Sequence, residues 1–401
     1  MESVWKVGNN LTWKEEYMYW RLIRFFVEEK EYRIFSLSAD QREVWLENLT
    51  DRHFPMIRIF LTDLDWANQL SGDMRQVHHT ADGWKKRFLR KRFQVLNIYV
   101  TPLPPVDDYE PLIERPLEGN GTLIETFLFV TENFPESNNR LTRIAGGTPF
   151  RVAKEGYEPY ESEEERRAVM DRILAEARRE KEMFHRGKPR LTYGILAINA
   201  FIFLLMELFG GSQNSLVLIL FGAKFNPLIV QGEWWRLFTC MFLHVGFFHL
   251  FMNSIALYYL GLAVERLYGN VRFAIIYLLS GFCGSLASFV LSPSLSAGAS
   301  GAIFGCFGAL LYFGLVYPHL FFRTMGKDVL SVIALNLVLG IILPGIDMAG
   351  HLGGLIGGFL ISGMVQLPKQ DRFHKRIPFF LVFGLLVVLG LYLGYRFPRI
   401  S

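Results

Sequence analysis

The sequence predicts a polytopic α-helical membrane domain preceded by a soluble α/β or α+β domain. Two observations predict this fold class: charged residues are unevenly distributed, and long apolar segments recur in only one half of the chain. Asp, Glu, Lys and Arg make up 62 of the first 190 residues but only 18 of the 211 that follow. Because soluble domains average about 25% charged residues, the first half is typical of a soluble domain and the second of a membrane domain.

The composition also excludes several classes of protein. The soluble half has a net charge of −2 and the membrane half +6, so no nucleic-acid partner is expected. Cys240, Cys283 and Cys306 lie in apolar segments, which indicates buried thiols with neither a disulfide framework nor metal-ligand spacing. The first residues contain no apolar core, so no cleaved signal peptide is expected.

Residues 1–158 are expected to form the soluble, cytosolic domain. Residues 11–30 predict a helix, and residues 63–92 predict one long helix or two shorter ones. Runs rich in β-branched and aromatic residues predict strands at 32–37, 44–46, 56–61, 93–101 and 122–131. Two interpretations of its histidines stay open, a metal site or an ordinary polar surface; the residues concerned are His53, His78 and His79, with Asp73 as a further ligand.

Residues 159–190 are expected to form a charged helical linker. Acidic and basic residues are dense from Glu161 to Arg186, and apolar residues such as Val169 and Ile173 recur at helical spacing. A solvated helix is the ordinary interpretation of this segment. Its basic end would also suit an anionic inner leaflet; the residues there are Arg178, Arg179, Lys181, Arg186, Lys188 and Arg190.

Seven apolar segments follow, each close to the ~20 residues that a helix needs to cross a bilayer core of ~30 Å. They lie at 191–210, 237–262, 271–292, 300–317, 328–344, 349–367 and 377–395. A further apolar run at 216–221 is too short to cross and is expected at the interface. Basic residues mark alternate loops, which predicts a multi-pass protein of the cell membrane with a cytoplasmic N-terminus and an extracellular C-terminus.

Polar residues at membrane depth are candidates for function because placing them in lipid is costly. His249 and Asn253 are four residues apart and therefore share one helix face, and His244 precedes them. Their side chains could donate hydrogen bonds into a cavity between helices. Hydrogen bonds that merely join two helices are the ordinary interpretation.

Ser300 lies where a loop of small residues meets the fourth apolar segment. Unpaired N–H groups at a helix start could stabilise an oxyanion that forms beside its hydroxyl. The neighbouring glycines, Gly298 and Gly301, would let a substrate backbone approach closely. A serine that caps the helix is the alternative.

His351, near the start of the sixth segment, is a candidate base for Ser300, since serine is a weak nucleophile without one. Gly-x-x-x-Gly pairs in both segments would allow close packing of the two helices. No carboxylate clearly completes a triad, because Asp347 lies just outside the span and Glu265 follows the second span on the opposite side. We therefore expect a Ser–His dyad, with Phe304 as an apolar wall that could orient the imidazole.

Taken together, these motifs resemble those of the rhomboid intramembrane serine proteases. The resemblance covers residues 190–370 and rests on Trp235-Arg236, on His244, His249 and Asn253, on Gly298-Ala299-Ser300-Gly301, and on Ala349-Gly350-His351-Leu352-Gly353-Gly354. It implies a six-helix protease core at 191–367, followed here by a seventh transmembrane helix at 377–395. Such an enzyme hydrolyses peptide bonds in or near the transmembrane segments of membrane proteins within the lipid bilayer, and the sequence implies no metal or organic cofactor.

The same resemblance implies roles for individual residues. Ser300 would be the nucleophile and His351 the base. His249, Asn253 and the backbone N–H of Ser300 would form the oxyanion hole, supported by His244. Trp235 and Arg236 would lie in the long first loop, and Phe304 stands where some family members carry tyrosine. The N-terminal domain, which shows no diagnostic motif, could bind an accessory partner or ligand.

Two other functions stay open at this point. A transporter would also place polar residues in its spans, but it predicts an internal repeat, and none is evident in the sequence. A non-proteolytic adaptor that binds membrane proteins would be expected to lack the serine or the histidine of the dyad, and this chain has both.

Overall fold

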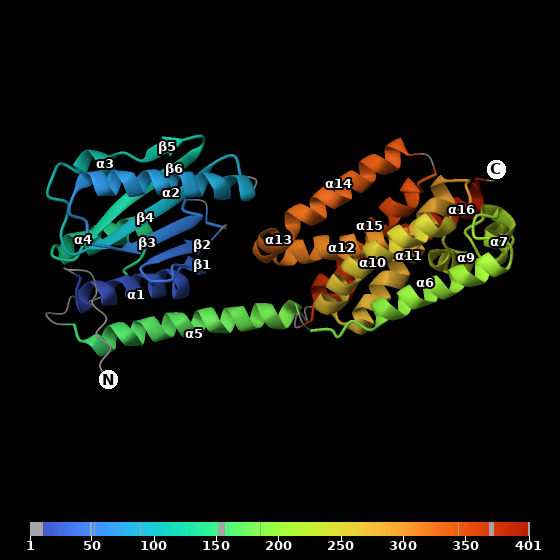
Figure 1. Ribbon diagram of the computed structural model, residues 1–401, viewed down its shortest axis with the longest axis horizontal. Helices are drawn as coiled ribbons and strands as arrows, with labels where there is room; N and C mark the ends of the chain where they lie inside the picture. Colours follow the sequence, from blue (N-terminus) through green and yellow to red (C-terminus); the bar gives the residue numbers. More distant parts are fainter. Residues whose placement is uncertain are drawn as a thin grey trace. The chain divides into compact units, whose positions relative to one another are not determined.

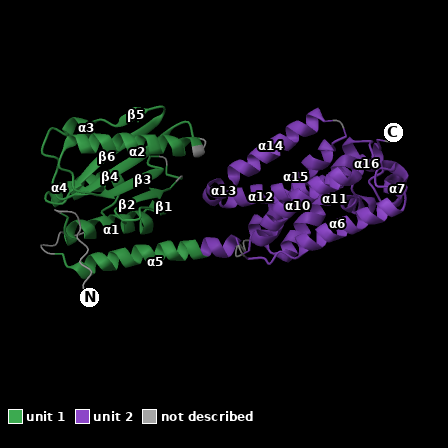
Figure 2. Ribbon diagram, viewed as in Figure 1, with its two compact units in different colours: residues 1–178 green, residues 179–401 purple. Residues whose placement is uncertain are grey.

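The computed structural model describes residues 11–48, 50–51, 53–88, 90–150, 157–184, 186–343, 345–368 and 373–399. The first residues, where we expect no signal peptide, lie outside this part. The chain divides into two compact units, residues 1–178 and 179–401 (Figure 2). The predicted fold class is confirmed: the first unit is a β-sheet covered by helices, and the second consists of apolar helices (Figure 1).

The first unit is built on a six-stranded sheet with the order β1-β2-β3-β4-β6-β5. Its strands are β1 (Arg33–Leu37), β2 (Glu43–Glu47), β3 (Met56–Leu61), β4 (Phe93–Thr101), β5 (Leu117–Gly119) and β6 (Thr122–Val130). β3, β4 and β6 run parallel, whereas β1, β2 and β5 pair antiparallel with their neighbours. All five predicted strands are confirmed. The three residues of β5 are too few to show a periodicity in the sequence.

Helices cover both faces of this sheet. They are α1 (Trp13–Glu28), α2 (Ala67–Arg87), α3 (Glu110–Glu114), α4 (Phe134–Ala145) and the start of α5 (Pro159–Phe184). Side chains alternate along β4, so Leu96 and Ile98 pack with α1 on one face and Val95 lies on the α2 face. Val169 of α5 joins the α1 side. Of the two alternatives for residues 63–92, the structure shows one long helix, α2. Helix α4 was not predicted, although Pro135 and Gly146 mark its ends.

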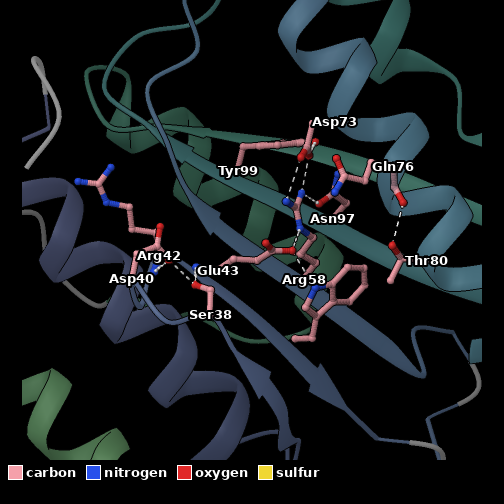
Figure 3. Close-up of polar contacts among 11 residues, drawn as sticks. Ser38, Asp40, Arg42, Glu43, Arg58, Asp73, Gln76, Thr80, Asn97 and Tyr99 are labelled. Atoms are coloured by element: carbon pink, nitrogen blue, oxygen red, sulfur yellow. Dashed lines mark hydrogen bonds and ion pairs between the residues drawn. The ribbon is translucent and has the colours of Figure 1, made fainter.

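A buried polar cluster lies between the sheet and α2 (Figure 3). Arg58 of β3 is 2% exposed, and its guanidinium donates to the carboxylates of Glu43 and Asp73. It also donates to Asn97 Oδ1 at 3.2 Å, and the Tyr99 hydroxyl donates to Asp73. Each charge of the cluster is therefore paired and hydrogen-bonded, as buried charges must be.

The residues considered for a metal site do not converge. The Asp73 carboxylate is held by Arg58, and His78 Nε2 lies 3.2 Å from the Gly119 carbonyl. Within the described ranges, no group of three His, Cys, Asp or Glu side chains is arranged to hold a metal ion. The geometry gives no support to a metal site formed by Asp73, His53, His78 and His79.

Each of the seven predicted apolar segments coincides with a helix of the second unit. Five helices in the described part are long and apolar enough to cross a membrane: α6 (Leu191–Leu208), α10 (Gly246–Tyr268), α11 (Asn270–Leu291), α15 (Met348–Val365) and α16 (Ile377–Arg396) with the turn before it. Helices α13 (Pro318–Thr324) and α14 (Gly326–Ile342) are bent by 74° and qualify only as a pair. Helix α12 (Ser300–Val316) has 17 residues, most of them buried.

The second predicted segment, at 237–262, is wrong at both ends. Its first residues form α9 (Arg236–Thr239) and the 3-10 turn η1 (Cys240–Phe242), and α10 starts only at Gly246, where a φ of +75° redirects the chain. Helix α10 continues past the predicted end to Tyr268 and includes Glu265. This acidic residue is fully buried, and all its charge is compensated by hydrogen bonds. It accepts hydrogen bonds from the backbone N–H groups that begin α6, from a threonine hydroxyl and from an asparagine amide.

The long first loop, between α6 and α10, contains short helices. The apolar run at 216–221 forms α7 (Ser215–Leu220), which has six residues and is too short to cross a membrane, as predicted. Helix α8 (Asn226–Val230) follows it and was not predicted. This loop leads through α9 and η1 directly into α10, which carries the polar residues described next.

Candidate active site

Helices α12 and α15, which carry Ser300 and His351, pack with their backbones in contact. A Cβ on Gly354 would collide with the carbonyl of Gly301, and one on Gly358 would collide with a carbonyl one turn further along α12. Only glycine permits this approach, so the close packing predicted from the Gly-x-x-x-Gly pairs is present. Because residue numbers increase together along the contact, α12 and α15 are parallel to each other there.

The serine and the histidine flank the start of this contact. Gly301 directly follows Ser300, Gly350 directly precedes His351, and a Cβ on Gly301 would lie 3.5 Å from the Gly350 carbonyl oxygen. Gly284 of α11 meets the same point, since a Cβ there would lie 2.7 Å from that oxygen. Three helices thus approach at glycines, and Ser300 and His351 lie at the same end of two adjacent helices.

Ser300 is the first residue of α12 and not its cap. Ala299 occupies the N-cap position, where no side chain makes a capping hydrogen bond. The alternative in which Ser300 caps the helix is therefore wrong, and its hydroxyl is available for another role. Gly298 has a φ of +144°, which favours glycine, and its N–H donates to the Cys240 carbonyl at 2.9 Å. This bond fixes the loop that leads into Ser300.

The imidazole of His351 is oriented by an aromatic ring. It stacks on Phe304 with a centroid distance of 4.2 Å and an interplanar angle of 12°. His351 Nδ1 is buried and has no hydrogen-bond partner among the described residues. The Asp347 carboxylate caps α15 through the Gly350 N–H instead. The ring of His351 is therefore held by stacking, while the nearby carboxylate of Asp347 contacts the backbone of α15.

The polar residues before and within α10 reach the loop that precedes α12. A Cβ on Gly298 would lie 3.0 Å from His249 Nε2, so this ring lies directly against the loop. His244 is fully buried, and its Nε2 is 3.5 Å from the Ala299 nitrogen. Asn253 Nδ2 donates one hydrogen to the His249 carbonyl at 2.9 Å, which leaves its second hydrogen for another acceptor.

Trp235 and Arg236 lie in the first loop and have other partners. Arg236 is 6% exposed, pairs with Glu233 and donates to the carbonyls of Ile219 and Ala223 at 2.7 and 3.1 Å. The Arg236 side chain therefore joins separate parts of the first loop to each other. Trp235 is 46% exposed, and exposed tryptophans are typical of the membrane–water interface. Among the described residues, neither of the two forms a hydrogen bond or a ring contact with Ser300 or His351.

This region is also supported by three residues to which the sequence analysis assigned no role: Asp347, Ser296 and Lys224. Asp347 accepts the Gly350 N–H at 2.9 Å and the Ser296 hydroxyl at 2.7 Å. Lys224 is fully buried and donates to two carbonyls of the loop before α12. Two signals were present: an acidic residue directly before an apolar segment is typical of a helix cap, and a lone lysine in an apolar stretch needs a partner.

The chain resembles one of the following relatives over nearly its whole length and the other two over less than half of it. Residues 231–367, which include Ser300 and His351, match the family model described as the rhomboid domain. The chain is 36% identical over 390 residues to rhomboid protease GluP of Bacillus subtilis (strain 168), covering 96% of this chain and 75% of that protein. It is 36% identical over 195 residues to the putative rhomboid protease YdcA of the same organism, covering 48% of this chain and 96% of the relative. RHOMBOID-like protein 1 of Arabidopsis thaliana is 40% identical over 170 residues, covering 41% of this chain and 43% of the relative.

Proposed function

The chain belongs to the rhomboid family, and we propose that it is an intramembrane serine protease with Ser300 as nucleophile and His351 as base. It is a multi-pass membrane protein. The observation that carries the proposal is the glycine contact between α12 and α15, at whose start both residues lie. The family relationship does not favour the transporter or the adaptor.

In the proposed reaction, Ser300 Oγ attacks the scissile carbonyl carbon while His351 takes the hydroxyl proton. The tetrahedral oxyanion then returns its electron pair to carbon, the C–N bond breaks, and His351 gives the proton to the leaving amine. This leaves an acyl group on Ser300. Water then attacks the ester with His351 again as base, which releases the acid and restores the serine.

The oxyanion needs donors that are in place before the reaction. We assign this role to the Ser300 backbone N–H, to His249 and to the second amide hydrogen of Asn253. The Val245 N–H donates to His249 Nδ1 at 3.3 Å, which favours the tautomer with its hydrogen on Nε2, beside Gly298. His244, which accepts from the loop backbone, would support this arrangement.

We propose that the substrates are membrane proteins with a transmembrane segment. Exposing a carbonyl of such a helix costs its hydrogen bond, so helix-breaking residues near the cut should favour cleavage. The protein would lie in the cell membrane with the N-terminal unit in the cytoplasm and the C-terminus outside. This orientation follows from basic residues in alternate loops; they are Arg266 with Arg272, Arg323 with Lys327, and Lys369, Arg372, Lys375 with Arg376. Lys369 and Arg372 lie outside the described residues.

A fluorophosphonate probe, which reacts with activated serines, tests the proposal without a known substrate. In detergent the wild-type protein should be labelled, whereas Ser300→Ala and His351→Ala should lose both labelling and cleavage of a model transmembrane substrate. Both variants should still insert into the membrane. Ser288→Ala is the control, because Ser288 is a serine of an apolar helix that has no role in the proposed reaction. Equal labelling of wild type and Ser300→Ala would refute the assignment.

A further inference from the structure

Asp347 joins the two segments that carry the proposed dyad. As the N-cap of α15, it accepts the Gly350 N–H on Oδ1 at 2.9 Å, and its backbone carbonyl accepts the His351 N–H at 3.0 Å. Its other oxygen, Oδ2, accepts the Ser296 hydroxyl at 2.7 Å. Because Ser296 lies four residues before Ser300, one carboxylate connects the loop of the serine to the first turn of the histidine's helix.

The loop that contains Ser296 is also anchored to the first loop. The backbones of Lys224 and Ser296 exchange two hydrogen bonds, at 2.9 and 3.0 Å, in an antiparallel bridge. Lys224 Nζ donates to the Ser292 and Ser294 carbonyls at 2.7 and 3.0 Å. Burial lowers the pKa of Lys224 to about 8, and the negative charge of Asp347 opposes that shift. The backbone bridge and the Lys224 ammonium therefore hold the segment that ends at Ser296, while Asp347 contacts the Ser296 hydroxyl.

We propose that Lys224, Ser296 and Asp347 form a clamp that holds Ser300 and His351 in register, with Asp347 as a positioning residue. The inference rests on the proposed function of Ser300 and His351. In a triad, a carboxylate on Nδ1 orients the base. Here Nδ1 of His351 has no partner among the described residues, so the ring position depends on the backbone of α15 and on the ring stack.

An ordinary helix cap explains only half of these contacts. A cap needs one side-chain oxygen, and Asp347 Oδ1 supplies it to Gly350. The second oxygen contacts a residue 51 positions away in the chain, which a cap does not require. Since a displacement of about 1 Å can lower a reaction rate by about 10²-fold, a contact that sets the distance between nucleophile and base can control turnover.

The contact between Ser296 and Asp347 can be broken from either side. Ser296→Ala removes the hydroxyl and leaves the cap intact. Asp347→Ser keeps a capping oxygen but is too short to reach Ser296. Asp347→Asn preserves both contacts, because its amide oxygen can accept from Gly350 and its NH₂ can donate to the Ser296 hydroxyl. Ser294→Ala is the matched control, since Ser294 is exposed and uses its backbone for its contact with Lys224.

For each full-length variant, the measurements are the rate of fluorophosphonate labelling, kcat and KM for a model transmembrane substrate, and thermal stability. We expect Ser296→Ala and Asp347→Ser to lower the labelling rate and kcat by about tenfold or more, with KM and Tm little changed. The double variant that combines Ser296→Ala with Asp347→Ser should have a labelling rate and kcat no lower than those of Asp347→Ser alone. Both changes remove the same hydrogen bond. Asp347→Asn and Ser294→Ala should react like wild type.

Wild-type rates in Ser296→Ala and Asp347→Ser would overturn the clamp while leaving the dyad in place. It is also overturned if rates fall only in step with Tm, or if Asp347→Asn fails to restore them, because Asp347 would then act as a structural cap alone. Absence of labelling at Ser300 in the wild-type protein would instead remove the proposed function, and the inference with it.

Discussion

The imidazole of His351 stacks on the phenyl ring of Phe304, with centroids 4.2 Å apart and ring planes 12° from parallel. Phe304 lies one helical turn beyond Ser300 on α12. The helix that carries the proposed nucleophile therefore also supplies the surface that orients the proposed base. A movement of α12 relative to α15 would change the stack and the distance between serine and histidine together.

Phe304→Leu should lower kcat by up to about tenfold with little change in KM, because an aromatic stack is worth about 0.5–1.5 kcal/mol. Phe304→Tyr keeps the ring and should retain wild-type turnover. Phe313→Leu is the matched control, since Phe313 is a fully buried phenylalanine on the same helix whose ring packs against Phe184, Tyr317 and Phe321. An equal loss of kcat in both leucine variants would show that packing, not the stack, is what Phe304 provides.

Asn253→Ala should lower kcat by about 10²-fold, as expected when one oxyanion donor is removed, with a smaller effect on KM. The control is Asn336→Ala on α14. Asn336 Nδ2 donates to the carbonyl four residues earlier at 2.8 Å, the same local bond that Asn253 makes at 2.9 Å. Loss of that bond alone should leave turnover unchanged. Steady-state cleavage of a model substrate measures both variants, and unchanged turnover in Asn253→Ala would remove it from the site.

Glu265→Ala should destabilise the second unit by about 3 kcal/mol or more, because three backbone donors at the start of α6, including that of the buried Thr192, would lose their acceptor. Thermal unfolding in detergent, followed by circular dichroism, measures the change as a lower Tm. Asp328→Ala is the control, since Asp328 is an exposed acidic residue in the first turn of α14 and should contribute at most about 1 kcal/mol. Equal Tm values for the two variants would contradict this role of Glu265.

Arg58→Met should destabilise the first unit by about 3–5 kcal/mol, because the Asp73 and Glu43 carboxylates would lose their buried partner (Figure 3). Hydrogen exchange of the amides of β3 and β4 in the full-length protein reports this loss. Arg172→Met, which removes a partly exposed pair with Glu176, should change the free energy of exchange by less than about 1 kcal/mol. Unchanged protection in Arg58→Met would mean that the cluster contributes no net stability.

Local patterns in the sequence predicted most elements of the fold. Apolar segments of sufficient length and alternating strand patterns depend only on neighbouring residues, and all five predicted strands and a helix at each of the seven apolar segments are present. The exceptions have tertiary causes. The start of α10 is displaced to Gly246 by the turn before it, and Glu265 lies inside the helix because distant N–H groups satisfy its charge.

The sequence by itself determined the fold class and the choice of Ser300 and His351 as candidates, because polar residues are conspicuous in apolar helices and small residues mark close packing. Only the tertiary structure decided that Ser300 is not a helix cap, that Phe304 stacks on His351, and that Asp347 reaches Ser296. Such contacts join side chains on different helices. Their formation depends on how the helices pack in three dimensions. The Gly-x-x-x-Gly spacing indicates that α12 and α15 approach closely, but it does not specify which side chains then meet.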